Sequence, residues 1–304
     1  METEASGSAA PRQDFRPGPP FFSAPPRLAG EESVSLDLAG IGVRFESLGG
    51  EMAALLRARF AGFLGTRADE VRVRAASAPV PCFLRRVRAG ESYRLETERQ
   101  GEALLVWSYG FAARYLHARR ECDLRLAPED GPARALSLEN VVRLLVSWRA
   151  LEEGELLLHA AGVERGGRAF VFFGPSGAGK TTACRLSEGR GRVLNDDTLL
   201  LRRGAAGWEA APLPLTGAYR LQAAPGFLPV AALCRLVQAP EPAVERLSAA
   251  LAVGEVVSCV PFFEDRPMDR ALLDVVGRLV REVPVGRLRF RRDPSFWEVL
   301  ERWI

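Results

Sequence analysis

Lysine is nearly absent from this sequence. The chain has 304 residues, and its 41 lysine and arginine residues include a single lysine, Lys180. Arginine replaces lysine readily on a surface, but a wide planar guanidinium fits poorly where a compact ammonium must enter a narrow anion-binding loop. The one position that keeps lysine is therefore the first candidate for an anion-binding residue.

Several other features are also missing. The sequence contains no uninterrupted apolar stretch of about 18 residues, which disfavours a membrane-spanning helix. Its N-terminus lacks the basic and apolar regions of a signal peptide. The five cysteines form no C-x-x-C pair, and the net charge is only +3, which disfavours a zinc site and a nucleic-acid or membrane partner. We expect a cytoplasmic protein with reduced thiols; its oligomeric state is left open, a homo-oligomer included.

The composition divides the chain into three parts. Residues 1–32 are rich in proline and glycine, which predicts a disordered tail. Alternating apolar residues in 33–152, with helical spacing over 50–64 and 138–151, predict a smaller α+β N-terminal domain. Residues 153–304 combine strand and helix patterns and carry the motifs described next, so we expect an α/β catalytic domain there.

A glycine-rich motif organises the third part. An apolar run over 169–173 is followed by helix-type residues after the sequence G-x-x-x-x-G-K-[ST], here Gly174, Pro175, Ser176, Gly177, Ala178, Gly179, Lys180 and Thr181, with Thr182 next. Small residues let backbone N–H groups converge on a phosphate at the positive end of a helix. Lys180 is then placed to reach the outer phosphates and the Thr181 hydroxyl to ligate Mg²⁺. The alternative is a plain glycine-rich turn.

Two adjacent carboxylates and a histidine complete the candidate site. Asp196 and Asp197 end the apolar run that follows the loop, about fifteen residues beyond it. Phosphate-loop enzymes need a carboxylate for Mg²⁺ and kinases need one to orient the attacking hydroxyl; the alternative is an Asx turn. His159 lies on the strand candidate before the loop, and pairing of the strands would bring it near the acidic pair.

The remainder of the chain carries weaker signals. Residues 213–240 are punctuated by proline and glycine, which predicts loops that contact a substrate or simply connect elements. Helical spacing predicts helices over 241–253 and 268–283, and a short strand is expected over 288–290. A final helix is expected over 293–304, with an apolar face that packs on the domain.

Together these pieces resemble a known family. His159-Ala-Ala-Gly, the loop, and Asn-Asp196-Asp197 resemble the C-terminal catalytic domain of HPr serine kinase/phosphorylase, and more closely the broader HPr-kinase-like group that does not act on HPr. The resemblance covers about residues 155–205. It implies a P-loop kinase fold of the HPr kinase and phosphoenolpyruvate carboxykinase-like type. It also implies that Asp196 is the catalytic base with His159 as its partner, and that Asp197 lies near the metal.

Two functions follow as hypotheses. The first is an ATP- and Mg²⁺-dependent kinase, in which Lys180 and the loop amides hold the phosphates, Thr181 and Asp197 hold Mg²⁺, and Asp196 directs a hydroxyl at the γ-phosphorus. The phosphoacceptor is then a peptide, a protein or a small alcohol. The second is a non-catalytic ATP-binding regulatory module. It is favoured by residues 215–220, which lack the acidic residue that true HPr kinases use to bind magnesium.

Overall fold

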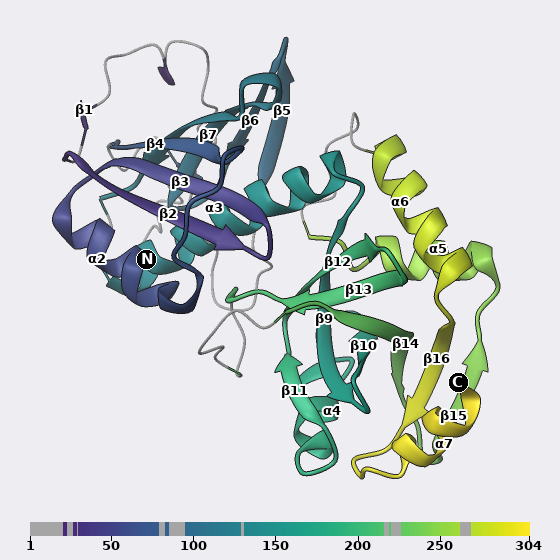
Figure 1. Ribbon diagram of the computed structural model, residues 1–304. Helices are drawn as coiled ribbons and strands as arrows, with labels where there is room; N and C mark the ends of the chain where they lie inside the picture. The colour runs from purple at the N-terminus through teal and green to yellow at the C-terminus, as the bar shows by residue number, and fades with distance from the viewer. Residues whose placement is uncertain are drawn as a thin grey trace, which may run out of the picture.

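The protein is a mixed α/β molecule built on two eight-stranded sheets, with helix α3 (Gly131–Glu152) lying between them (Figure 1). Within the part of the chain that the structure describes, no helix is both long and apolar enough to cross a membrane. This computed structural model describes the residues 21–22, 27–28, 30–78, 83–84, 95–128, 131–215, 219, 226–261 and 269–304.

The first sheet belongs to the N-terminal half of the chain. Its strand order is β2-β3-β4-β8-β7-β6-β5, and α2 (Gly50–Arg59) and α3 contribute to the hydrophobic core on one face. The alternation predicted from the sequence is present, because Val34, Leu36 and Leu38 point into this core. The strands are β2 (Glu32–Leu38), β3 (Ile41–Leu48), β4 (Val71–Ser77), β5 (Glu96–Gln100), β6 (Ala103–Trp107), β7 (Phe111–Leu116) and β8 (Glu121–Leu126).

The expected disorder of residues 1–32 is wrong where that segment is described. Phe22 is 4% exposed and belongs to a second apolar cluster with Phe83 and Trp107. Strand β1 (Arg27–Leu28) pairs with the end of β4, and β2 begins at Glu32. Burial of an aromatic ring outweighs the local effect of proline-rich composition. The remaining residues of the expected tail lie outside the described residues.

The second sheet has the order β10-β9-β12-β13-β14-β16-β15, with β11 beside β9. Strand β10 also pairs in parallel with β14, and β14 pairs in parallel with β16. Helices α4 (Lys180–Ser187) and α7 (Phe296–Trp303) contribute to the core on one face, and α5 (Ala249–Val257) and α6 (Asp269–Glu282) to the core on the other. The strands are β9 (Leu156–Arg165), β10 (Arg168–Phe173), β11 (Arg192–Asn195), β12 (Thr198–Gly204), β13 (Gly207–Pro212), β14 (Leu228–Gln238), β15 (Ala243–Arg246) and β16 (Val285–Phe290).

Two sequence predictions fail in this half. The predicted loops over 213–240 include the long strand β14, because proline and glycine mark only its entry and the apolar run after them is buried in the sheet. The single helix predicted over 241–253 is instead β15 followed by a helix. The helices here are α4 (Lys180–Ser187), α5 (Ala249–Val257), α6 (Asp269–Glu282) and α7 (Phe296–Trp303). Helices α6 and α7 confirm the helices predicted over 268–283 and 293–304.

Helix α3 is enclosed by apolar neighbours over much of its length. Val141, Leu145 and Trp148 are 2% exposed or less, and the cluster that contains them includes Leu157 and Leu200 from the second sheet. A helix that is apolar around most of its circumference must be buried on several sides. The helix therefore packs against both sheets, and its side chains reach the edge of the candidate site.

Candidate functional site

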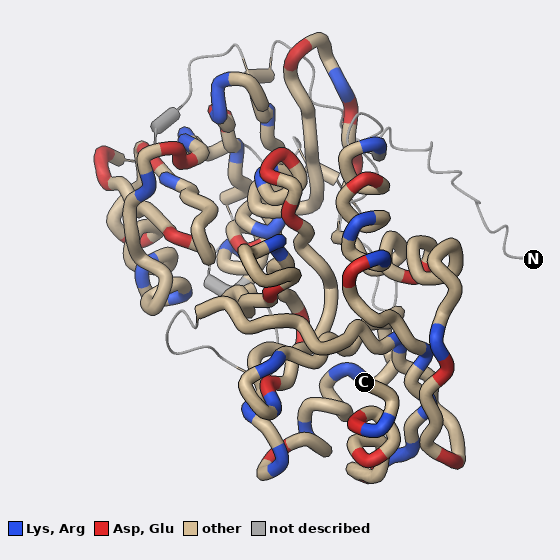
Figure 2. Tube along the Cα trace, turned by 45° about the vertical axis from the view of Figure 1, so that its right-hand side comes forward, with Lys and Arg blue, Asp and Glu red and all other residues tan. Residues whose placement is uncertain are grey.

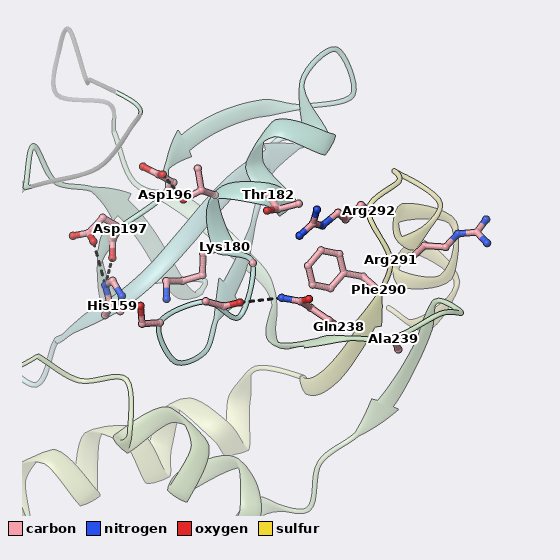
Figure 3. A pocket seen from close by; sticks show the side chains of 14 residues that line it. His159, Lys180, Thr182, Asp196, Asp197, Gln238, Ala239, Phe290, Arg291 and Arg292 are labelled. Atoms are coloured by element: carbon pink, nitrogen blue, oxygen red, sulfur yellow. Dashed lines mark hydrogen bonds and ion pairs between the residues drawn. The ribbon is translucent and has the colours of Figure 1, made fainter. Parts of the chain in front are cut away.

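A cavity of about 910 Å³ lies at the carboxyl ends of the parallel strands β10, β14 and β16 (Figure 3). Parallel strands end at the same edge of a sheet, so segments far apart in the sequence meet there. The loop after β10, the end of β14 and the end of β16 all contribute. The lining residues are His159, Ser176, Gly177, Gly179, Lys180, Thr181, Thr182, Asp196, Asp197, Gln238, Ala239, Phe290, Arg291 and Arg292.

The glycine-rich loop takes a conformation that other residues adopt poorly. Gly177 and Gly179 have φ values of 78° and 105°, and a Cβ on Gly179 would lie 2.6 Å from Cζ of Phe290. Helix α4 begins at Lys180, whose Nζ donates hydrogen bonds to the carbonyl oxygens of Gly174 (2.8 Å) and Pro175 (3.3 Å). Burial lowers the pKa of Lys180. The N-terminus of α4 and one ammonium group therefore face the same hollow.

Asp196 lies against the loop. It is 5% exposed, and its Oδ2 accepts a hydrogen bond of 2.8 Å from the Thr181 hydroxyl. The turn after β11 is fixed by Asn195, which accepts from the backbone N–H of Asp197 and donates to the Leu213 carbonyl. A hydroxyl and a carboxylate are hard oxygen donors of the kind that Mg²⁺ prefers, so Thr181 and Asp196 fit that ion.

His159 is the partner of the second aspartate. Its Nδ1 lies 2.9 Å from the carbonyl oxygen of Asp197 and 3.4 Å from Asp197 Oδ1 (Figure 3). The backbone register explains this, because His159 pairs with Thr198 across β9 and β12 and so lies beside the residue that precedes it. His159 thus contacts Asp197, whereas the resemblance implied Asp196 as its partner. Burial lowers the pKa of His159 and outweighs the opposing effect of Asp197.

Arg143 is a site residue that sequence reasoning missed. It comes from α3, and its Nη2 donates to Asp197 Oδ2 at 3.1 Å, while its Nη1 donates to Asn140 Oδ1 at 2.9 Å. Asp197 Oδ2 also accepts from the Thr198 hydroxyl at 2.7 Å. Arg143 and Asp197 lie 54 residues apart in the chain, so no local pattern could have linked them.

The ends of β14 and β16 were also missed as parts of the site. Gln238 Nε2 donates to the carbonyl oxygen of Gly177 at 3.0 Å and so ties the end of β14 to the loop. Phe290 packs beneath Gly179, and Arg292 follows it at the cavity edge. The parallel pairing of β10, β14 and β16 is the signal that would have found them, but a single sequence does not reveal that pairing.

The family model described as SynChlorMet cassette protein ScmC matches residues 122–304. The chain belongs to the ScmC family. The resemblance to HPr-kinase-like proteins is thus a likeness of motifs, whereas the family shown by the match is ScmC.

Similarity outside this family is low. No curated protein sequence matches the chain significantly. Among solved structures, the HPr(Ser) kinase/phosphatase from Coxiella burnetii matches with a TM-score of 0.30 and 13% sequence identity, over 48% of this chain and 93% of that chain. A similarity at this level supports no argument about the function of this ScmC-family chain.

Proposed function

We propose that this protein is an ATP- and Mg²⁺-dependent kinase that transfers the γ-phosphate to a hydroxyl group of a peptide, a protein or a small alcohol. One observation carries the proposal. Lys180, the Thr181–Asp196 pair and the His159–Asp197 pair line a single cavity beside the N-terminus of α4. A phosphate-binding loop, a metal-binding pair and a carboxylate for the acceptor are the parts that phosphoryl transfer requires. Residues 153–304 would then form a P-loop kinase domain and residues 33–152 its N-terminal domain.

The loop would bind the phosphates of the nucleotide. Its backbone N–H groups and the positive end of α4 favour an anion. Lys180 Nζ, which donates to the Gly174 and Pro175 carbonyls, would exchange these partners for oxygens of the outer phosphates. The lowered pKa of Lys180 expresses the cost of burying its charge, and this cost falls when an anion is bound beside it.

The geometry supports a division of labour opposite to the one that the resemblance implied. Asp196 holds the Thr181 hydroxyl, so these two residues would ligate Mg²⁺. Bound magnesium would neutralise charge on the phosphates. Among the described residues no group of three or more His, Cys, Asp and Glu could hold a metal ion, so this metal assignment rests on Thr181 and Asp196 alone.

Asp197 would orient the acceptor hydroxyl. Its Oδ2 accepts from Arg143 and Thr198, which leaves Oδ1, beside His159, as the oxygen for an incoming hydroxyl. His159 Nδ1 must donate to the Asp197 carbonyl that it faces, so the neutral ring carries its lone pair on Nε2. Burial lowers the pKa of His159 and so favours the neutral ring. Asp197 and His159 can thus receive the proton that the hydroxyl releases.

The test is phosphoryl transfer by the full-length protein. Purified chain is incubated with γ-labelled ATP, Mg²⁺ and a lysate of the source organism, and the labelled product is identified. We expect one acceptor labelled by the wild type and none by Lys180→Ala, whose folding is checked by thermal melting. If ATP binds but no acceptor is labelled, the non-catalytic ATP-binding module replaces the kinase.

A further inference from the structure

Two adjacent arginines follow β16 and differ sharply in their surroundings. Arg291 forms an ion pair with Asp293. Arg292 is exposed and forms no hydrogen bond or ion pair with another residue that the structure describes. In Figure 3 the Arg291 side chain points away from Lys180, whereas that of Arg292 turns back past the Phe290 ring toward Thr182. Both residues line the cavity, but the Arg291 guanidinium is paired with Asp293, whereas that of Arg292 is available at the cavity edge.

The position of Arg292 relative to the loop indicates which part of a ligand it meets. His159 and Asp197 lie at one end of the cavity, and Arg292 lies at the other, beyond Thr182 (Figure 3). If the terminal phosphate reacts at Asp197, the rest of the nucleotide must extend along the loop toward Arg292. This inference thus rests on the proposed function and adds an orientation to it.

The floor at this end is rigid. Phe290 is 2% exposed and packs against Gly179, where no Cβ would fit. Gln238 holds the loop from the neighbouring strand through the Gly177 carbonyl. Arg292 follows Phe290 directly, so its backbone is anchored to the loop that it faces. From this anchored backbone the guanidinium can present a planar pair of donors that matches a phosphate group.

We propose that Arg292 binds the α-phosphate of a nucleoside di- or triphosphate and so fixes the nucleoside end of the ligand beyond Thr182. Neither the motif nor the acidic pair indicates this residue. The site formed by the loop alone would accept two phosphates, and Arg292 would extend it to the phosphate that carries the sugar.

Calorimetry with two ligands on the full-length protein tests this assignment. ATP spans the loop and Arg292, whereas inorganic pyrophosphate occupies the loop alone. Arg292→Ala should weaken Mg·ATP about tenfold or more, since one charge-assisted hydrogen-bonded contact is lost, and should leave pyrophosphate within about twofold. Arg289→Ala, at an exposed residue of β16 that does not line the cavity, is the matched control and should bind both ligands like the wild type. Melting temperatures without ligand verify that both variants fold.

The outcomes separate this inference from the proposed function. If Arg292→Ala and Arg289→Ala bind ATP equally well, or if Arg292→Ala loses pyrophosphate as strongly as ATP, the α-phosphate assignment is wrong while nucleotide binding stands. If the wild type binds neither ATP nor pyrophosphate, the proposed function falls and this inference falls with it.

Discussion

The two sheets carry their charges in different ways. On the outer face of the first sheet, oppositely charged residues are direct cross-strand partners: Arg72 lies opposite Glu121 at 2.8 Å, and Arg74 opposite Asp123 at 3.7 Å. At the cavity of the second sheet, Lys180 donates to loop carbonyls and Arg292 meets none of the described acidic residues. Figure 2 shows both signs of charge interspersed along the chain.

Charge alone therefore does not identify a binding site. Exposed pairs that satisfy one another contribute little, about 0–1 kcal/mol each, and leave no unbalanced charge for a ligand. Cationic groups beside a hollow, without acidic partners in the described residues, keep their capacity to bind an anion. The first sheet is thus expected to tolerate charge changes that the cavity does not.

The comparison is sharpest between two aspartates that each contact arginine. Asp197→Asn should lower phosphoryl transfer by about 10²–10⁴ while ATP affinity stays within a few-fold, because an amide cannot accept the acceptor's proton. Asp123, which contacts Arg74 and Arg114 on the first sheet, is the matched control, and Asp123→Asn should transfer phosphate normally. The rate of labelling of the identified acceptor measures both. Equal rates for wild type and Asp197→Asn would end the assignment of Asp197.

The apolar cluster that contains Phe22 is expected to stabilise the fold. Phe22→Ala should cost about 3 kcal/mol of unfolding free energy, because a buried ring leaves a cavity, and should leave ATP affinity unchanged. Phe21→Ala, at a partly exposed neighbour, is the control and should cost less. Denaturant unfolding and calorimetry measure the two effects. A Phe22→Ala protein as stable as the wild type would show that the burial of Phe22 does not stabilise the fold.

Arg143 lies on α3 and contacts Asp197 at the cavity. Its electrostatic effect can be tested through the titration of His159. Burial is the main cause of the lowered pKa of His159, and the charge of Arg143 adds a smaller lowering effect. Arg143→Ala should therefore raise this pKa, and Arg143→Lys, which keeps the charge, should shift it less. The chain has only two histidines, so their proton NMR titrations are readily separated. Arg143→Ala should also lower phosphoryl transfer about tenfold, since Asp197 loses a charge-assisted hydrogen bond. An unchanged His159 titration would rule out electrostatic coupling.

The half-buried carboxyl of Glu155, at the junction of α3 and β9, is expected to give the smallest change in stability. Burial, with Glu153 nearby, raises the pKa of Glu155 from 4.5 to about 7. The folded state therefore binds more protons than the unfolded state between these values, and stability falls as pH rises through that window. Glu155→Gln should match the wild type at pH 4 and exceed its stability by about 1 kcal/mol at pH 8, allowing for solvent screening.

Denaturant unfolding at the two pH values measures this difference. Glu298→Gln, at a residue whose side chain is 70% exposed, should show no such pH dependence. A Glu155→Gln advantage that is equal at both pH values would contradict the shifted pKa.

The segment around the glycine-rich loop could be predicted from local sequence. The run into β10, the glycine spacing and the start of α4 are local features, and the structure has them where expected. The closeness of His159 to the acidic pair followed from assuming that the strands pair. Which aspartate it meets could not be predicted, because a shift of one residue in the β9–β12 register would exchange Asp196 and Asp197.

Other parts of the site depend on long-range packing. Arg143 reaches Asp197 because α3 packs against both sheets. Gln238 and Arg292 reach the loop because β14 and β16 run parallel to β10. The prolines before β14 favoured a loop prediction for that segment. The burial of Phe22 depends on side chains that are distant in sequence. Such contacts have no signature within a window of ten or fifteen residues.

The most direct test of the proposed roles of the two aspartates is the Mg²⁺ dependence of ATP binding in Asp196→Asn and Asp197→Asn, measured by calorimetry with and without the metal. We expect Asp196→Asn to lose about tenfold or more of the affinity that Mg²⁺ adds, because a metal ligand is removed, and Asp197→Asn to keep it within about twofold. The reverse result, with Mg²⁺ dependence lost in Asp197→Asn and kept in Asp196→Asn, would contradict these roles.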